Sequence, residues 1–196
     1  MKKENCFVFC LIIFVLGVLA CGSVFLALDE YRKPRYYAAI DSLSGLDPAT
    51  DLGRPSLDPL FNITLSVASQ GFRHSECIPP GTYVEVSYRG SPLATGTAVQ
   101  LCARPRKAPR EQSLVAWGRG VSVPGFRLDN LAADARLGVE VFEVTLQMPP
   151  THDHVGKIVT CKARRVGDDA ALRAPCDSSN MGHYWTPSPK DLHGGA

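Results

Sequence analysis

The chain has 196 residues, of which 45% are hydrophobic and 20% are charged. This length accommodates one domain of ordinary size together with flanking segments. Lys and Arg number 21 against 19 Asp and Glu, a formal net charge of +2. Because nucleic-acid-binding proteins carry a clear basic excess, this balance disfavours that class, and we expect no nucleic-acid partner.

The N-terminal segment after residues 1–6, a short tail, predicts a transmembrane helix. Residues 7–28 (FVFCLIIFVLGVLACGSVFLAL) contain no charge and no proline. As a helix this run is about 33 Å long at ~1.5 Å per residue, which matches a hydrocarbon core of ~30 Å. A buried helix of a domain this small does not need an apolar surface on every side, so a core helix is disfavoured.

A cleavable signal peptide is the main alternative for this segment. Lys2 and Lys3 would form its basic end, and residues 18–21 (VLAC) resemble a weak lipoprotein cleavage site. The apolar run is longer than the roughly 7–15 residues of a signal peptide and continues beyond Cys21, so we favour an uncleaved anchor. Cations flank both ends of the run, and the positive-inside rule therefore gives no clear orientation.

The cysteines and one sequon bear on the compartment. Four cysteines lie outside the apolar run: Cys77, Cys102, Cys161 and Cys176. An even number permits two disulfides in an oxidising compartment, whereas four unpaired buried thiols in a cytosolic domain are the alternative. A bridge from Cys161 to Cys176 would contribute ~3 kcal/mol by the chain-entropy estimate. Asn62-Ile63-Thr64 is a candidate N-glycosylation site, so the C-terminal domain is placed outside the cell.

The remainder of the chain is divided by proline and glycine. Residues 29–56 show little periodicity and are expected to form a juxtamembrane stalk. Residues 60–68 alternate apolar and polar side chains, as a half-buried strand does. Residues 79–81 (PPG) predict a turn, 84–88 a second strand, 89–92 (RGSP) another turn, and 93–101 a third strand.

The second half of the domain continues this pattern of short elements. A strand is expected at 114–117, and Trp117-Gly118 at its end predicts a bulge or a close approach of another segment. Helical spacing at 128–135 predicts one or two helical turns. Residues 138–148 change phase, which predicts a β-bulge or a change of buried face. A last strand begins at Ile158, and 179–196 are expected to be a flexible tail. Residues 57–178 therefore predict an all-β antiparallel sandwich of the immunoglobulin or fibronectin III type.

Several short motifs follow the apolar segment in order. They are 61–65 (FNITL), 86–94 (VSYRGSPLA), 117–121 (WGRGV) and the closing Cys161 and Cys176. Together they resemble the plant membrane proteins with a type 2 late embryogenesis abundant domain, the non-race-specific disease resistance and harpin-induced-like family. The first strand lacks the Asn-Pro-Asn turn usual in that family, so the chain resembles a divergent member. The resemblance implies the sandwich, plasma-membrane residence and a link to defence or stress.

Candidate sites of chemistry are few. His152-Asp153-His154 could supply ligands to a metal only with a third ligand from elsewhere, and it follows Pro149-Pro150 in an expected surface turn. The basic segment 103–110 (ARPRKAPR) suits a solvated loop, with anionic headgroups or an acidic partner as the alternative. Nucleophile-elbow, phosphate-loop and dinucleotide motifs are absent from the sequence. We therefore assign no catalytic, cofactor or metal residues.

The expected function is a non-enzymatic, membrane-anchored interaction or signalling module in plant defence or stress. Its partner would be a protein, a lipid or a cell-wall component. A dehydration-protective protein is an alternative, although an ordered sandwich lacks the disordered composition of such proteins. An extracytoplasmic enzyme or a metal-binding protein using His152 and His154 is the third alternative.

Overall fold

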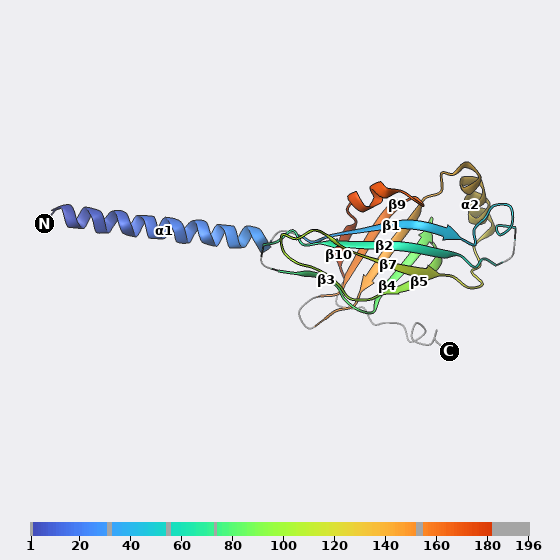
Figure 1. Ribbon diagram of the computed structural model, residues 1–196, viewed down its shortest axis with the longest axis horizontal. Helices are drawn as coiled ribbons and strands as arrows, with labels where there is room; N and C mark the ends of the chain where they lie inside the picture. The colour runs from blue at the N-terminus through green and yellow to red at the C-terminus, as the bar shows by residue number, and fades with distance from the viewer. Residues whose placement is uncertain (1, 31–32, 54–55, 73, 152–154, 182–196) are drawn as a thin grey trace.

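The computed structural model describes residues 2–30, 33–53, 56–72, 74–151 and 155–181 (Figure 1). A long helix, α1 (Lys2–Glu30), projects from one end of a β-rich domain, and a shorter helix, α2 (Gly125–Leu137), lies at the other end. The described strands are β1 (Arg35–Ser44), β2 (Leu60–Ala68), β3 (Glu76–Ile78), β4 (Thr82–Tyr88), β5 (Ser91–Ala98), β6 (Leu101–Ala103), β7 (Arg110–Trp117), β8 (Phe142–Met148), β9 (Lys157–Arg164) and β10 (Asp177–Asn180), with a 3-10 turn, η1, at Asp169–Arg173.

The helix expected over residues 7–28 is present within α1. Its described side chains, residues 11–27, are all exposed, including Phe14 at 72% and Phe25 at 68%. In the described part of the chain, no helix combines the length and the apolar character needed to cross a membrane. The structure thus confirms the helix.

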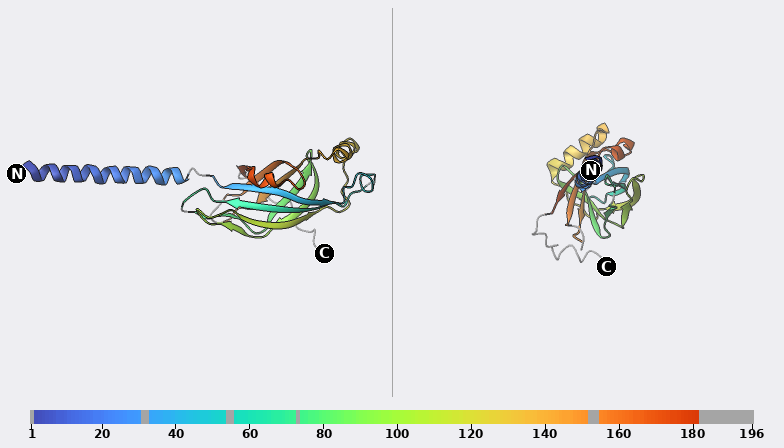
Figure 2. Two further views of the ribbon diagram at one scale, coloured as in Figure 1. Left: turned by 45° about the horizontal axis from the view of Figure 1, so that its top comes forward. Right: turned by 90° about the vertical axis from the view of Figure 1, so that its left-hand side faces the viewer.

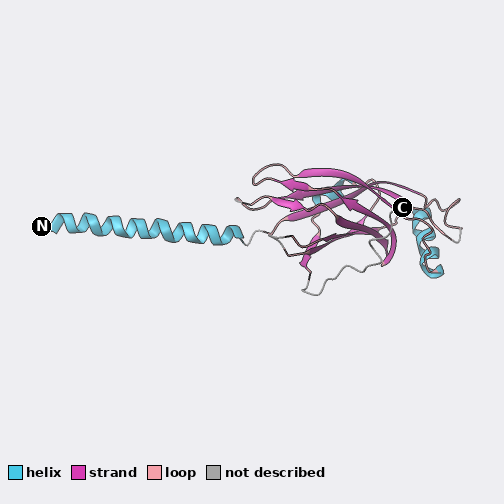
Figure 3. Ribbon diagram, turned by 90° about the horizontal axis from the view of Figure 1, so that it is seen from below, coloured by secondary structure: helices cyan, strands magenta, loops and turns pink. Residues whose placement is uncertain are grey.

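Eight strands form one curled sheet in the order β1-β2-β7-β5-β4-β8-β9-β10, and all of its strand pairs are antiparallel. Strands β5 and β7 are paired only at Thr95 and Trp117. The sheet therefore consists of two well-paired groups of strands, β1-β2-β7 and β5-β4-β8-β9-β10, which are joined at this one pair. Together they curve around a common interior (Figure 3). Strands β3 and β6 form a separate pair. The expectation of an all-β antiparallel fold is confirmed at this level.

The two ends of the curled sheet approach each other through backbone hydrogen bonds. The amide of Gly167 donates to the carbonyl of Ile40 at 2.8 Å, and the amide of Cys176 donates to that of Tyr36 at 2.8 Å. Ile40 also forms a parallel bridge with Val166. Seen along α1, the strands accordingly surround the interior (Figure 2). These contacts satisfy part of the open edge of β1, which would otherwise present unpaired backbone groups.

The core consists of side chains that alternate along the strands toward the interior. In β2, Phe61, Ile63, Leu65 and Val67 are fully buried, as the alternation predicted. The ring of Phe61 meets that of Phe142 edge-on, with centroids 5.2 Å apart. At ~25 cal/mol per Å² of apolar area, burial of such large side chains is the main stabilising contribution to the domain.

The expectation that residues 29–56 form a stalk is wrong in part. Residues 35–44 form β1, which pairs with β2 along its length and buries Tyr36, Ala38 and Ile40. The inward position 38 is a small alanine, and the inward Tyr36 is followed by a second tyrosine that faces outward. The sequence therefore shows only a weak alternation of apolar and polar residues.

Three expectations in the second half of the domain also need correction. The phase change in 138–148 arises because β8 begins only at Phe142, while Val139 and Val141 precede it and are exposed. The bulge lies in the facing strand β9, where Ala163 has a φ of 53°. The expected short helix is longer, spanning α2, and the domain extends beyond residue 178 because β10 reaches Asn180 and Met181 is buried.

Candidate functional site

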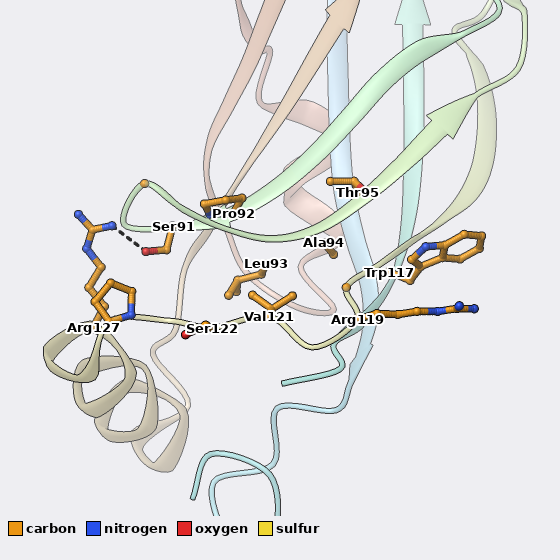
Figure 4. Close-up of a pocket in the computed structure, with 13 residues that line it drawn as sticks. Ser91, Pro92, Leu93, Ala94, Thr95, Trp117, Arg119, Val121, Ser122 and Arg127 are labelled. Atoms are coloured by element: carbon orange, nitrogen blue, oxygen red, sulfur yellow. Dashed lines mark hydrogen bonds between the residues drawn. The ribbon is translucent and has the colours of Figure 1, made fainter. Parts of the chain in front are cut away.

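A groove of about 820 Å³ lies at the end of the domain away from α1 (Figure 4). One wall is the start of β5, from Gly90 to Thr95, and the other is the segment that follows β7. Leu93 and Val121 lie between the two walls, Arg127 of α2 stands at one end, and Trp117 and Arg119 stand at the other. At this edge of the groove, β5 and β7 are paired only at Thr95 and Trp117.

The exposed side chains of the groove combine an aromatic ring with cations. Trp117 is 57% exposed, and Arg119 and Pro92 are also exposed. An exposed indole presents a large rigid surface, and arginine presents a planar array of donors, which is why both are enriched at binding sites. The groove is therefore suited to non-covalent contact with a partner that has apolar and anionic or hydrogen-bond-accepting groups.

The close packing of the two groove walls requires a glycine at position 118. A Cβ at residue 118 would collide with the carbonyl oxygen of Leu93, and it would also contact Val121 and Pro59. The close approach predicted from Trp117-Gly118 is thus present, and it lets the chain leave β7 directly beneath β5. The amide of Gly118 donates to the carbonyl of Pro59 at 2.8 Å, which fixes this path.

Helix α2 is held against the groove by polar contacts as well as by burial of Leu131 and Ala132. Arg127 donates from Nη1 to the hydroxyl of Ser91 at 2.7 Å. The hydroxyl of Tyr88 donates to the carboxylate of Asp134 at 2.6 Å, and Arg89 forms an ion pair with the same carboxylate at 3.1 Å. These contacts tie α2 to the β4–β5 hairpin, whose turn places Arg89 and Gly90 at positive φ.

Two pKa values in this cluster are displaced from their ordinary range. Burial, together with the hydrogen bond to Asp134, raises the pKa of Tyr88 to about 12. The hydrogen bond from Tyr88 and the neighbouring Arg89 lower the pKa of Asp134. Tyr88 therefore stays protonated and Asp134 ionised over a wide range of pH around neutrality.

The four cysteines outside the apolar run form two disulfides, Cys77–Cys102 and Cys161–Cys176. The first joins β3 to β6 at facing positions, and the second joins β9 to the segment before β10. The sequence permitted two bridges among these residues and left their connectivity open. Neither bridge lies among the residues that line the groove.

The described residues that remain from the sequence analysis do not line the groove. Asn62 is half-buried in β2 and donates from Nδ2 to the hydroxyl of Ser42 at 2.6 Å. His152, Asp153 and His154 lie outside the described residues. Within the described ranges, no set of three or more His, Cys, Asp or Glu side chains is arranged to hold a metal ion.

Arg127 was missed by sequence reasoning because it belongs to no recognisable motif, and Arg119 was noted only as part of 117–121 (WGRGV), without a binding role. Gly118 was the one residue whose local sequence indicated part of the groove. A comparison of the chain with models of protein families, with curated proteins and with solved structures found no match.

Proposed function

We propose that this protein is a single-pass, membrane-anchored interaction module without enzymatic activity. The observation that carries the proposal is the exposure of α1. Side chains such as Phe14, Leu19 and Phe25 are 63–72% exposed and lie along a helix that projects away from the domain. An apolar surface of this size is unfavourable in water and favourable in lipid. The side chains of α1 are described over residues 11–27, and the apolar run of the sequence extends further, over residues 7–28.

The two disulfides support a location of the domain outside the cytosol, because such bonds persist in oxidising compartments. We propose that the protein lies in the plasma membrane, as the family resemblance implies, with residues 33–196 on the extracellular side. The groove at the far end of the domain would then face away from the bilayer, where it can receive a partner. Its aromatic and cationic lining is the kind of surface that binds rather than reacts.

The finer classification is part of the same proposal. The curled sheet, divided at Thr95 and Trp117, is compatible with an immunoglobulin or fibronectin III-like sandwich. The motifs at 61–65, 86–94 and 117–121 resemble those of the late embryogenesis abundant type 2 family. On this basis we propose a role in plant defence or stress. The ordered core favours this role over protection during dehydration.

Two arginines placed in α1 test the anchor. We expect the Val15→Arg/Leu19→Arg chain to lose membrane insertion, because each arginine at the centre of a membrane helix costs about 2.5–3.5 kcal/mol. The measurement is the share of the full chain that resists extraction from membranes at alkaline pH. The Val15→Leu/Leu19→Val chain is the matched control and should remain in the pellet. Complete extraction of the unsubstituted chain would contradict the anchor.

A further inference from the structure

The groove at the end of the domain away from α1 is lined by cations and by no carboxylate. Arg119 and Arg127 are the charged side chains among its lining residues. In the described part of the chain, neither arginine takes part in an ion pair. Arg119 is exposed, and Arg127 uses Nη1 for its hydrogen bond to Ser91. Most N–H donors of the two guanidinium groups are therefore open to an anionic ligand.

Two carboxylates on the segments next to the groove are engaged by other donors. Asp58 accepts a hydrogen bond from the amide of Gly120 at 2.7 Å. Asp134 accepts a hydrogen bond from the hydroxyl of Tyr88 and pairs with Arg89. These contacts offset the negative charge of both carboxylates, so the charge that the lining of the groove presents is positive.

Two further carboxylates belong to neighbouring elements without lining the groove. Glu85 is aligned with Thr95, but it lies in β4, on the side of β5 away from β7. Asp129 follows Arg127 by two residues, which corresponds to about 200° around the axis of α2. Because the charged groups of the lining are both cations, the groove favours a ligand with negative charge.

The backbone of the groove walls is not suited to pairing with a peptide strand. Pro92 has no amide hydrogen, and Gly118 packs directly against the carbonyl oxygen of Leu93. On the opposite wall, the amides of Gly118 and Val121 donate to carbonyls of the segment 57–59. An extended peptide that binds by strand addition needs a row of free backbone donors and acceptors, and the row is broken on both walls.

The groups that the groove presents to a ligand are therefore carried by side chains. The indole of Trp117 is 57% exposed, and a rigid ring of this size offers a surface on which the C–H face of a sugar ring can pack. Thr95 and Ser122 supply hydroxyls, which both donate and accept hydrogen bonds. A guanidinium binds a carboxylate through two parallel hydrogen bonds. This combination suits a sugar that carries carboxylates.

The two arginines lie at opposite ends of the groove. Arg119 lies with Trp117 at one end, and Arg127 lies at the other, with Leu93 and Val121 between them (Figure 4). A ligand with a single anionic group would meet only one of the arginines. A linear ligand that repeats its anionic group along its length can meet both.

We propose that the groove binds an anionic oligosaccharide with carboxylates on successive sugar rings, a polyuronate. One sugar ring packs on the indole of Trp117, and carboxylates of the same oligomer pair with Arg119 and with Arg127. The inference rests on the proposed interaction module and names the chemistry of its partner.

A calorimetric titration of the full chain in detergent with a short oligogalacturonate tests this inference. The matched ligand is the same oligomer with its carboxyl groups converted to methyl esters, which keeps the sugar rings and removes their charge. We expect saturable binding of the acid and binding of the ester that is weaker by about tenfold or more, because the charge-assisted hydrogen bonds to arginine are lost.

Exposed side chains provide variants that leave the fold intact. Arg119→Gln and Trp117→Ala should each weaken binding of the acid by about tenfold or more. The matched controls are Arg104→Gln, an exposed cation in the loop between β6 and β7, and Val115→Ala, an exposed residue of β7 outside the groove. Both controls should bind like the unsubstituted chain. A loss in Arg104→Gln equal to that in Arg119→Gln would show attraction to charge alone and would overturn the inference.

The remaining outcomes separate the inference from the proposed function. No binding of the acid, equal affinity for its ester, or equally tight binding of a polyglutamate peptide would refute the polyuronate site. None of these results bears on the anchor, because the titration is made in detergent. Binding followed by shortening of the oligomer would support the site and contradict the absence of enzymatic activity.

Discussion

Replacing Tyr88 by alanine is expected to destabilise the domain by about 3–5 kcal/mol, as deletion of a large buried aromatic side chain does. Tyr88 is fully buried, and its ring lies 6.2 Å from that of Phe142. The substitution also removes the hydrogen bond to Asp134, so α2 loses a link to the hairpin that forms the groove. The free energy of unfolding of the full chain in detergent, measured with urea, provides the test.

Two variants separate the contributions of Tyr88. The Tyr83→Ala chain changes a partly exposed tyrosine of the same strand and should lose much less stability. The Tyr88→Phe chain keeps the ring and loses only the hydroxyl, so its loss should be a minor part of the alanine effect. A Tyr88→Ala chain as stable as the Tyr83→Ala chain would show that the ring does not contribute as its burial indicates.

The hydrogen-bonded pair of Tyr88 and Asp134 makes the stability of the domain depend on pH at both acidic and alkaline values. Because folding lowers the pKa of Asp134, its contribution is present above its unfolded value of 3.8 and is lost as the pH falls through the folded value. Because folding raises the pKa of Tyr88 from 10.0 to about 12, its contribution is present below pH 10 and is lost as the pH rises through about 12. The Tyr88→Phe chain should show a weaker dependence in both ranges.

Removing the Cys161–Cys176 disulfide is expected to cost about 3 kcal/mol, since the bond closes a loop with a sequence separation of 15. Cys161 is buried in β9, and the amide of Cys176 donates to Tyr36 of β1. The bridge therefore fixes one of the contacts that bring the ends of the sheet together. Arg164, buried beside it, donates to the carbonyl of Ala174 and to the sulfur of Cys176.

The measurement is the urea midpoint of the Cys161→Ala/Cys176→Ala chain. The Cys21→Ala chain is the control, because Cys21 is an unpaired, exposed cysteine of α1 and its replacement should not move the midpoint. Adding a reductant should lower the midpoint of the unsubstituted chain more than that of the double variant. An unchanged midpoint in the double variant would mean that the bond does not constrain the unfolded chain.

The sequence predicted best the strands whose inward positions hold large side chains. Strand β2 was found because Phe61, Ile63 and Leu65 alternate with polar residues. Strand β1 was missed because alanines carry little hydrophobic signal, and β10 was missed because its residues, Asp177–Asn180, are polar and exposed. These two strands are defined by backbone pairing at the edges of the sheet, which side-chain patterns do not encode.

The candidate groove was predictable only at Gly118. Its other features depend on tertiary structure: β5 and β7 are paired only at Thr95 and Trp117, and α2 folds back to place Arg127 beside Ser91. The basic segment 103–110 was visible in the sequence. Its proximity to α1 became apparent only from the registers that align Arg35 and Arg110 with the end of β2.

Protease protection of the full chain, synthesised into sealed microsomes, tests the central claim most directly. The account predicts that residues 33–196 are protected until the membrane is opened, and that glycosidase treatment shifts the mobility of the protected fragment through a glycan on Asn62. Digestion of the domain in sealed microsomes, without a glycan, would contradict the account. The domain would then face the cytosol, where its two disulfides would not be maintained.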